Sequence, residues 1–181
     1  MSSREKLEQA AIELITQQGY QQTTAQQIAD RAGVTERTFF RQFSDKSDVL
    51  FSKTEDYIAH YADGLSRSTA DTLLSKVYDV YYFVASTLFK NLHGHAKQRQ
   101  LIIQSEPALI ERELYKAYEV VQFLTEQLSV EFEPLATRLS VQSMNVVFHT
   151  AYEKWLAQPN DDAVLADIFA DTYHAWQQLN Q

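Results

Sequence analysis

Apolar positions recur every three or four residues along most of the chain, which is the period of an amphipathic helix. The four glycines fall at or near the ends of these runs and the three prolines at or near their starts, as helix boundaries favour. No sustained alternation of apolar and polar residues and no Asn-Gly or Asp-Gly hairpin signal occurs. The pattern predicts an all-α fold. The expected helices span residues 3–18, 24–32, 35–43, 46–62, 70–92, 96–104, 107–132 and 134–158, and the last runs from Asp161 or Asp162 to residue 179.

Between Thr24 and Phe43 the sequence predicts two short helices joined by a tight turn. Thr24 and Gln27 have the spacing of a capping box, in which each side chain satisfies a backbone N–H of the first turn. Gly33 stands where the first helix must stop, because glycine tolerates the left-handed conformation, and Thr35 is a second N-cap. Helix, tight turn, helix is the pattern of a DNA-binding motif, but also of a plain corner between two helices.

The second of these helices directs polar side chains outward. Donors and acceptors of these kinds read base edges and bind phosphates. A small residue at Ala29, the glycine at Gly33, a buried Val34 and the aromatic residues that follow all fall in the register of a helix-turn-helix, which favours the DNA-binding interpretation. The outward positions are Glu36, Arg37, Thr38, Arg41 and Gln42.

Residues 33–46, Gly-Val-Thr-Glu-Arg-Thr-Phe-Phe-Arg-Gln-Phe-Ser-Asp-Lys, resemble the recognition-helix signature of the TetR (tetracycline-repressor) family, and Thr-Thr-x-x-x-Ile-Ala precedes them. The resemblance covers about residues 6–50. It implies a homodimeric transcription regulator with an N-terminal three-helix DNA-binding domain, residues 1–46, and a C-terminal helical effector-binding and dimerisation domain, residues 47–181. At the position of Phe40 the family usually has a tyrosine, and the hydroxyl of that tyrosine contacts a phosphate. Phe40 has no hydroxyl to make that contact.

The net charge of −8 is unevenly distributed along the chain. Residues 1–46 carry six Lys and Arg and six Asp and Glu, whereas residues 47–181 carry 10 and 18. The acidic C-terminal part would repel DNA, so the neutral N-terminal part is expected to face it. Non-specific affinity for DNA should therefore be modest, and specific contacts must supply more of the binding.

Composition narrows the class of protein further. Apolar residues at 45% and charged residues at 22% are typical of a globular chain with a buried core. The absence of cysteine excludes disulfides, thiol catalysis and thiolate zinc fingers. The longest apolar run, residues 80–85, is far shorter than the ~20 residues that span a bilayer. Residues 1–5 do not resemble a signal peptide, so we expect a cytoplasmic protein with no membrane partner.

The expected DNA contacts divide into base-reading and backbone positions. Residues 35–42 would enter the major groove, with Arg37 as the first candidate for reading a base, preferably guanine. The weaker candidates for reading bases are Thr38, Gln42 and Gln26, with Thr35 and Glu36 beside them, and the residues expected at or near the backbone are Thr24, Phe40, Arg41 and Lys46.

Aromatic side chains in the later helices allow two interpretations. They form an ordinary core, or they line a cavity for an apolar or aromatic effector, which the family resemblance implies. The candidate effector-binding residues are Tyr57, Tyr61, Tyr78, Tyr82, Phe83, Phe123, Phe148 and Trp155. The last two helices carry more aromatic surface than a small body needs, which predicts a four-helix bundle formed by two chains and hence a homodimer.

Motifs for catalysis or metal binding are not visible in the sequence. His93 and His95 flank a glycine, but no third ligand follows at a suitable spacing, so we expect exposed histidines at a helix end. No Gly-x-Ser-x-Gly elbow, phosphate-binding loop or dinucleotide fingerprint occurs. We therefore expect no enzyme, no metal and no cofactor.

These observations together predict a sequence-specific DNA-binding transcriptional regulator, a repressor, that binds a pseudo-palindromic operator in double-stranded DNA. It would act as a homodimer through its last two helices and respond to an unknown small-molecule effector. By resemblance, the helix over 46–62 would carry the effector signal. Two rivals remain open: an all-helical small-molecule-binding protein or enzyme in which the helix-turn-helix is only structural, and a protein-interaction adaptor that uses the C-terminal helices.

Overall fold

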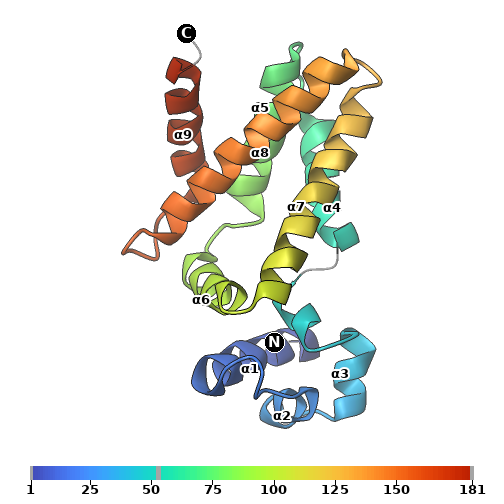
Figure 1. Cartoon of the computed structure of the whole chain (residues 1–181), viewed down its shortest axis with the longest axis vertical. Helices are drawn as coiled ribbons and strands as arrows, with labels where there is room; N and C mark the ends of the chain where they lie inside the picture. Colours follow the sequence, from blue (N-terminus) through green and yellow to red (C-terminus); the bar gives the residue numbers. More distant parts are fainter. Residues whose placement is uncertain (1, 52–53, 180–181) are drawn as a thin grey trace. The chain divides into compact units, whose positions relative to one another are not determined.

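The computed structural model describes residues 2–51 and 54–179, and every regular element in these ranges is a helix (Figure 1). The predicted all-α fold is confirmed. The chain forms two compact units. We call the described residues of the first unit, 2–51 and 97–113, the head, and those of the second, 54–96 and 114–179, the body. The head thus takes in a segment from the middle of the chain, which the predicted division at residue 46 did not include.

Three helices form the N-terminal part of the head, and each begins where the sequence predicts. Helix α1 (Ser3–Gln18) ends at Gly19, whose φ is 87°. Helix α2 (Ala25–Arg31) begins with the predicted capping box, in which the Gln27 N–H donates to the Thr24 hydroxyl at 3.2 Å. Helix α3 (Glu36–Gln42) is capped by the Thr35 hydroxyl.

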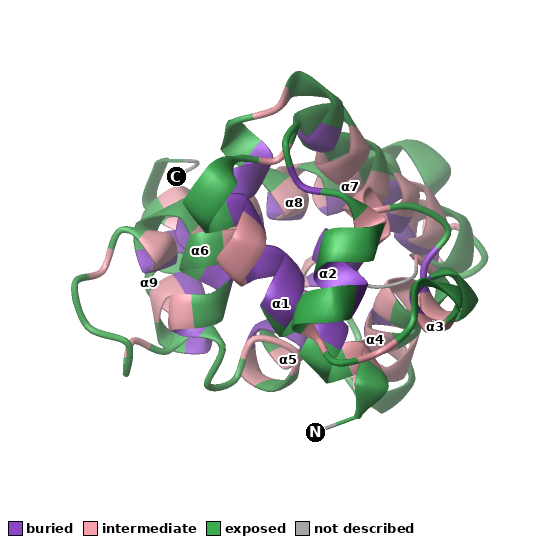
Figure 2. Cartoon of the chain, turned by 90° about the horizontal axis from the view of Figure 1, so that it is seen from below, coloured by how far each residue is buried: buried purple, intermediate pink, exposed green. Residues whose placement is uncertain are grey.

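The core of the head lies between these helices and two later segments. Figure 2 shows buried stripes on α1 and α2 and a largely exposed α3. One aromatic side chain of α3, Phe39, is fully buried and fixes that helix to the core. The buried core residues are Leu7, Ala10, Ala11, Ile12, Ile15, Ile28, Ala29, Phe39, Phe43, Val49, Leu50, Phe51, Ile102, Ile103 and Leu109.

The predicted continuous helix over 46–62 is wrong. The chain instead forms a short 3-10 helix, η1 (Ser47–Leu50), and then helix α4 (Thr54–Arg67), which runs five residues beyond the predicted end. Asp45 explains the tight turn, because its carboxylate accepts from the Ser47 and Asp48 backbone N–H groups at 2.7 and 3.1 Å. Phe51 then adopts an extended conformation, with φ −126° and ψ 134°, and is buried in the head. Residues 52 and 53, which the predicted helix includes, lie outside the described residues.

The segment 97–113 supplies the remaining wall of the head. It contains the end of α6 (His93–Gln104) and the beginning of α7 (Pro107–Leu128). We call it the α6–α7 corner. Ile102, Ile103 and Leu109 of this corner are buried in the head core.

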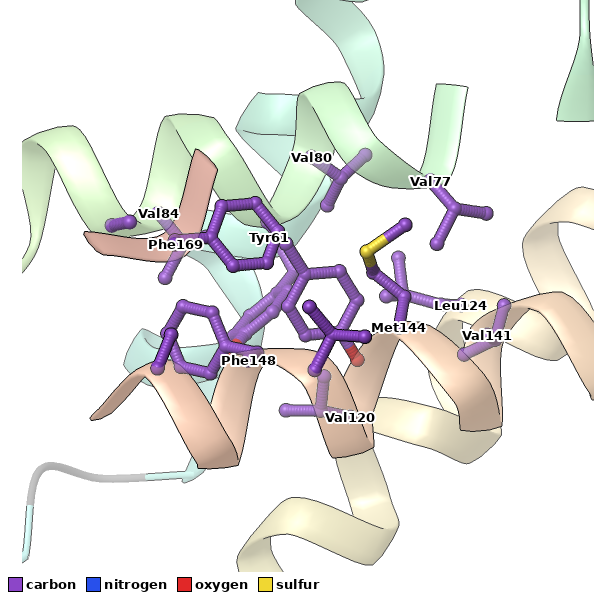
Figure 3. Close-up of a cluster of buried hydrophobic side chains, with 14 of the residues drawn as sticks. Tyr61, Val77, Val80, Val84, Val120, Leu124, Val141, Met144, Phe148 and Phe169 are labelled. Atoms are coloured by element: carbon purple, nitrogen blue, oxygen red, sulfur yellow. The ribbon is translucent and has the colours of Figure 1, made fainter. Parts of the chain in front are cut away.

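Helices α4, α5 (Leu73–Thr87), α8 (Pro134–Leu156) and α9 (Leu165–Leu179), with the later part of α7, form the body. Helix α5 packs against α4, α8 and α9, so it occupies the central position expected from its apolar residues on several sides. Figure 3 shows valine, leucine, methionine and aromatic side chains meeting between these helices. Gly64 allows α4 to approach α5, because a Cβ at that position would lie 3.2 Å from the Val80 carbonyl oxygen.

Two expectations about the body are also wrong. Helix α6 begins at His93, three residues earlier than predicted, so Gly94 lies in its first turn instead of ending the preceding helix. His93 is 2% exposed, not at the surface: its Nε2 lies 2.8 Å from the Trp155 carbonyl and its Nδ1 3.0 Å from Asp161. Asp161 therefore faces His93 and does not cap the last helix, which begins at Leu165.

Candidate nucleic-acid interface

The exposed face of α3 combines charged side chains with one phenyl ring. Glu36, Arg37 and Arg41 are exposed, and Phe40 is 53% exposed between them. Helical residues three and four apart lie on one face, so these four positions form one surface. The opposite side of the helix is held by Phe39, whose ring centroid lies 5.4 Å from that of the buried Phe43. A short helix is thus fixed on its apolar side and presents two guanidinium groups to solvent.

The turn before α3 is fixed by backbone geometry. Gly33 has φ 69°, a conformation that favours glycine, and the Val34 N–H donates to the Ala29 carbonyl at 3.0 Å. The Thr35 hydroxyl accepts from the Thr38 N–H at 3.2 Å and lies 3.0 Å from the Thr38 hydroxyl. These contacts make Thr35 first of all a capping residue and engage Thr38 as its partner, and each hydroxyl retains capacity for a further hydrogen bond.

The α2 candidates and Gln42 lie at or near the surface. Thr24 is exposed at the start of α2, where its hydroxyl accepts the Gln27 N–H. Gln26 is exposed, and its amide donates to the Asp30 carboxylate at 2.7 Å. Gln42 is half-buried at the end of α3. A duplex could meet Thr24 without rearrangement, whereas Gln26 would have to exchange its bond to Asp30.

Lys46 makes contacts within the head that its sequence position did not indicate. Its ammonium donates to the carbonyl of Tyr20 at 2.6 Å and to that of Thr23 at 2.9 Å. It also lies 4.2 Å from the centroid of the Tyr20 ring. The ammonium therefore ties the loop between α1 and α2 to the residues that follow α3, and its donors are engaged.

Two arginines of the α6–α7 corner hold the segment that follows α3. Arg112 donates to the Ser47 hydroxyl and the Asp48 carboxylate, and Arg99 donates to the Leu50 carbonyl. The two guanidinium carbons lie 5.0 Å (Arg99) and 4.9 Å (Arg112) from the centroid of the Phe51 ring. We call Arg99 and Arg112, with these contacts, the arginine clasp.

The clasp reaches the end of α3 through Asp48. This carboxylate also accepts from the Ser44 N–H at 2.6 Å, two residues beyond the end of α3. Burial acts to raise the pKa of Asp48, but the hydrogen bonds from Arg112 and from Ser44 outweigh it, so the pKa lies below its usual value. A charged Asp48 therefore connects the corner to the C-terminus of the exposed helix.

Sequence reasoning did not find Arg99, Arg112 or Phe51 as partners. The arginines lie 48 or more positions after Phe51 in the sequence, and nothing in their local pattern indicates a contact over that separation. The one available signal was an aromatic residue, Phe51, within two turns of the candidate caps Ser44 and Asp45.

Most of the proposed effector-binding residues join one network of ring contacts in the body. Tyr57 contacts Tyr61 with ring centroids 5.4 Å apart, and Tyr61 contacts Tyr81 at 5.4 Å. Tyr81, which was not among the predicted residues, contacts Phe148 at 5.3 Å. Tyr78 joins through Phe169 at 5.4 Å. Tyr82 stacks on Tyr78, and Trp155 reaches Phe148 through Phe89.

The two other candidates lie elsewhere in the body. Phe83 is half-buried, with the guanidinium of Arg67 5.3 Å from its ring centroid, and Phe123 is half-buried against the body core. Burial raises the pKa values of the Tyr61 and Tyr81 hydroxyls well above the usual range, so both hydroxyls are neutral donors. The Thr125 hydroxyl on α7 is buried with no hydrogen-bond partner.

Other chemistry gives no competing site among the residues described. Over 2–51 and 54–179, histidine, aspartate and glutamate side chains form no group of three suited to a metal ion. In the same ranges no helix has both the length and the apolar character that crossing a bilayer requires.

An exposed polar helix, packed through one aromatic side on a preceding helix and tight turn, has the arrangement of a helix-turn-helix DNA-binding motif. Residues 8–52 match the family model of bacterial regulatory proteins, tetR family. This match confirms the predicted resemblance: residues 8–52 form the DNA-binding domain of a TetR-type regulator. The chain is therefore a DNA-binding regulator of transcription.

Individual proteins are similar over most of the chain. The uncharacterized HTH-type transcriptional regulator YvkB of Bacillus subtilis is 26% identical over 160 residues, which cover 88% of this chain and 73% of YvkB. The structure of Thermus thermophilus FadR, a TetR family repressor in complex with lauroyl-CoA, is 18% identical with a TM-score of 0.53, covering 96% of this chain and 93% of that one. A SmeT–triclosan complex is 16% identical with a TM-score of 0.62, covering 97% and 91%. These structures show the fold alone.

Proposed function

We propose that the protein is a homodimeric repressor, located in the cytoplasm, which binds a pseudo-palindromic operator and is released by a small apolar or aromatic molecule. The observation that carries the proposal is the surface of α3, where Arg37 and Arg41 are exposed on a helix fixed by the buried Phe39. In such motifs the recognition helix enters the major groove with its N-terminal residues at the base edges.

Within this proposal, Arg37 reads a base, because it lies in the first turn of α3 and an arginine fork matches the two acceptors of guanine. Glu36, Thr38 and Gln42 flank that contact. Thr24 and Arg41 bind the backbone. Lys46 is left out of the proposed contacts because its ammonium is already bound to two carbonyl groups.

Dimerisation is proposed through α8 and α9. Leu135, Leu139 and Val146 of α8 are exposed in the single chain and recur at spacings of four and seven, so they share one face. Exposed apolar side chains gathered on one helix face mark interaction surfaces. Helix α9 packs beside α8 and adds the exposed Leu179, and Val164, just before α9 begins, is exposed as well. Two copies would bury this surface as a four-helix bundle about a two-fold axis.

An effector site is proposed in the aromatic network of the body. The rings from Tyr57 to Phe148 form an apolar interior, and the Tyr57 and Tyr61 hydroxyls, 3.3 Å apart, add polar groups to it. The buried Thr125 hydroxyl has no partner, and a bound ligand could supply one. The lauroyl chain bound by Thermus thermophilus FadR and the triclosan bound by SmeT are molecules of this apolar or aromatic class.

Control of the head is proposed to pass through the α6–α7 corner. Helices α6 and α7 each have residues in both compact units, and the corner holds the segment after α3 through the arginine clasp. A second tie joins the corner to the loop after α1, since the Gln21 amide donates to Glu106 at 2.8 Å. An effector that favours a different arrangement of α6 or α7 would change the population of binding-competent heads.

Selection of duplexes from a random pool tests the proposal. We expect the purified chain to enrich a two-fold symmetric sequence, to bind it as two chains per duplex by light scattering, and to lose affinity when lauroyl-CoA or triclosan is added. Coenzyme A without the acyl chain is the control for the first ligand. Enrichment of no sequence would contradict a regulatory role and favour a carrier or enzyme, and binding as a single chain would contradict the proposed dimer.

A further inference from the structure

The ring of Phe40 is an unusual feature of the α3 surface. It is the large hydrophobic residue that residues 2–51 leave exposed, at 53%. The ring packs edge-to-face on the buried Phe39, with centroids 5.3 Å apart and planes at 83°, so its inner edge is fixed while its outer part faces solvent. Its neighbours on the same face are the charged Glu36, Arg37 and Arg41.

A phenyl ring in such a place can recognise only one kind of base edge. It has neither a donor nor an acceptor, so it makes no hydrogen bond to a phosphate or to a base. All four bases present hydrogen-bonding groups in the major groove. Thymine alone also presents an apolar group there, its C5-methyl. Contact between the ring and that methyl removes apolar surface of both from water, which is favourable.

We propose that Phe40 reads a thymine of the operator through the C5-methyl group. The inference rests on the proposed function, because it requires α3 to lie in the major groove. It adds a specificity-determining residue where resemblance suggested only a backbone position.

The position of the thymine follows from the helix. Phe40 lies three residues after Arg37, and side chains at that spacing start about 5–6 Å apart. Successive bases rise about 3.4 Å along one strand. The thymine should therefore lie one or two base pairs from the base that Arg37 contacts, once in each half-site.

Replacement of thymine by deoxyuridine tests this directly, because it removes the methyl group and changes no hydrogen-bonding atom. The probe is the duplex selected from the random pool, with each symmetric pair of thymines replaced in turn. Burial of one methyl group corresponds to about a four-fold change in affinity, so two half-sites give about fifteen-fold. We expect this loss at one thymine pair for the wild-type chain and its disappearance in Phe40→Ala.

Two control variants isolate the contribution of the Phe40 ring. Leu101→Ala removes another exposed apolar side chain of the head, outside α3, and should leave the thymine-to-uracil ratio as in the wild type. Phe40→Leu keeps an apolar side chain and should retain part of the ratio if Phe40→Ala binds too weakly to measure.

Two results would overturn the inference while leaving the proposed function intact. One is a selected duplex whose affinity is insensitive to uracil at every thymine, and the other is a sensitivity that persists unchanged in both Phe40 variants. A uniform gain for Phe40→Tyr on a uracil-insensitive duplex would place the ring at the phosphate backbone instead. Failure to select any duplex contradicts the proposed function itself.

Discussion

Replacing Arg112 by alanine should destabilise the head while leaving the body nearly unchanged. The change removes hydrogen bonds to the Asp48 carboxylate and the Ser47 hydroxyl and the contact with the Phe51 ring. All of these partners belong to the head. Asp48 keeps the Ser44 N–H but loses its charged partner.

The size of the effect follows from the exposure of the pair. Hydrogen bonds to charged groups contribute about 1.5–3 kcal/mol when buried and much less when solvated. The side chains of Arg112 and Asp48 are 37% and 21% exposed, so we take the lower end of that range. The contact with Phe51 adds about 0.5–1 kcal/mol. The free energy of unfolding of the head should fall by about 2 kcal/mol.

Two spectroscopic signals separate the units in a urea titration. Both tryptophans, Trp155 and Trp176, lie in the body, so their fluorescence reports on the body alone, whereas circular dichroism at 222 nm reports on helices of both units. Arg112→Ala should shift the first part of the dichroism transition to lower urea and shift the fluorescence transition less. Arg112→Lys should lose less, because an ammonium can still pair with Asp48 although it cannot reproduce the fork.

Arg41→Ala is the matched control, because Arg41 is exposed on α3 of the same unit and, with no DNA in the titration, should change stability by less than about 0.5 kcal/mol. A loss for Arg112→Ala no larger than for Arg41→Ala would refute the arginine clasp as a stabilising element of the head.

Three further predictions concern the same unit. Arg37→Ala should cost about 1–3 kcal/mol in operator binding and relax specificity at one base pair, measured by repeating the duplex selection; an equal loss on every sequence would refute base reading. Lys46→Ala should lower the free energy of unfolding by about 1–2 kcal/mol, because two carbonyl groups lose their donor. It should leave the salt dependence of operator binding, the slope of log K against log salt, almost unchanged. A slope smaller by about one unit would assign a phosphate contact to Lys46. The pKa of Asp48 is lower in the folded chain than its ordinary value, so its stabilisation is present above the unfolded pKa and lost as pH falls through the folded pKa. In urea titrations from about pH 5 to pH 2, the free energy of unfolding should fall less for Asp48→Asn than for the wild type. An identical pH profile for both chains would contradict this.

Local rules were sufficient to predict the first three helices from the sequence. The capping box at Thr24, the left-handed Gly33 and the N-cap at Thr35 each act within four residues, so their effect can be read along the chain. Helical spacing correctly predicted that Phe39 and Phe43 would be buried and that Arg37 would face outward, but it also placed Phe40 on the apolar face, and that ring is 53% exposed.

The errors arose where a distant residue decides the local structure. The helix predicted over 46–62 is interrupted because Phe51 is held in the head by Arg99 and Arg112, far along the chain. His93 is buried because the end of α8 and Asp161 supply a polar partner for each of its two ring nitrogens. Helical periodicity contains no information on such pairings.

Pattern alone predicted that Glu36, Arg37 and Arg41 would be exposed on one helix, whereas their contacts with DNA stay a prediction. The engagement of Lys46 with two carbonyl groups depends on the path of the α1–α2 loop, which no sequence signal specifies.

Hydroxyl-radical footprinting on the selected duplex tests the central claim, that a symmetric pair of α3 helices reads DNA, most directly. We expect two protected regions related by a two-fold axis, on one face of the duplex, with centres about 10 base pairs or a multiple apart. We also expect Arg37→Ala to weaken both regions equally. A single asymmetric protected region, or protection that Arg37→Ala leaves unchanged, would contradict the claim that paired α3 helices bind the operator.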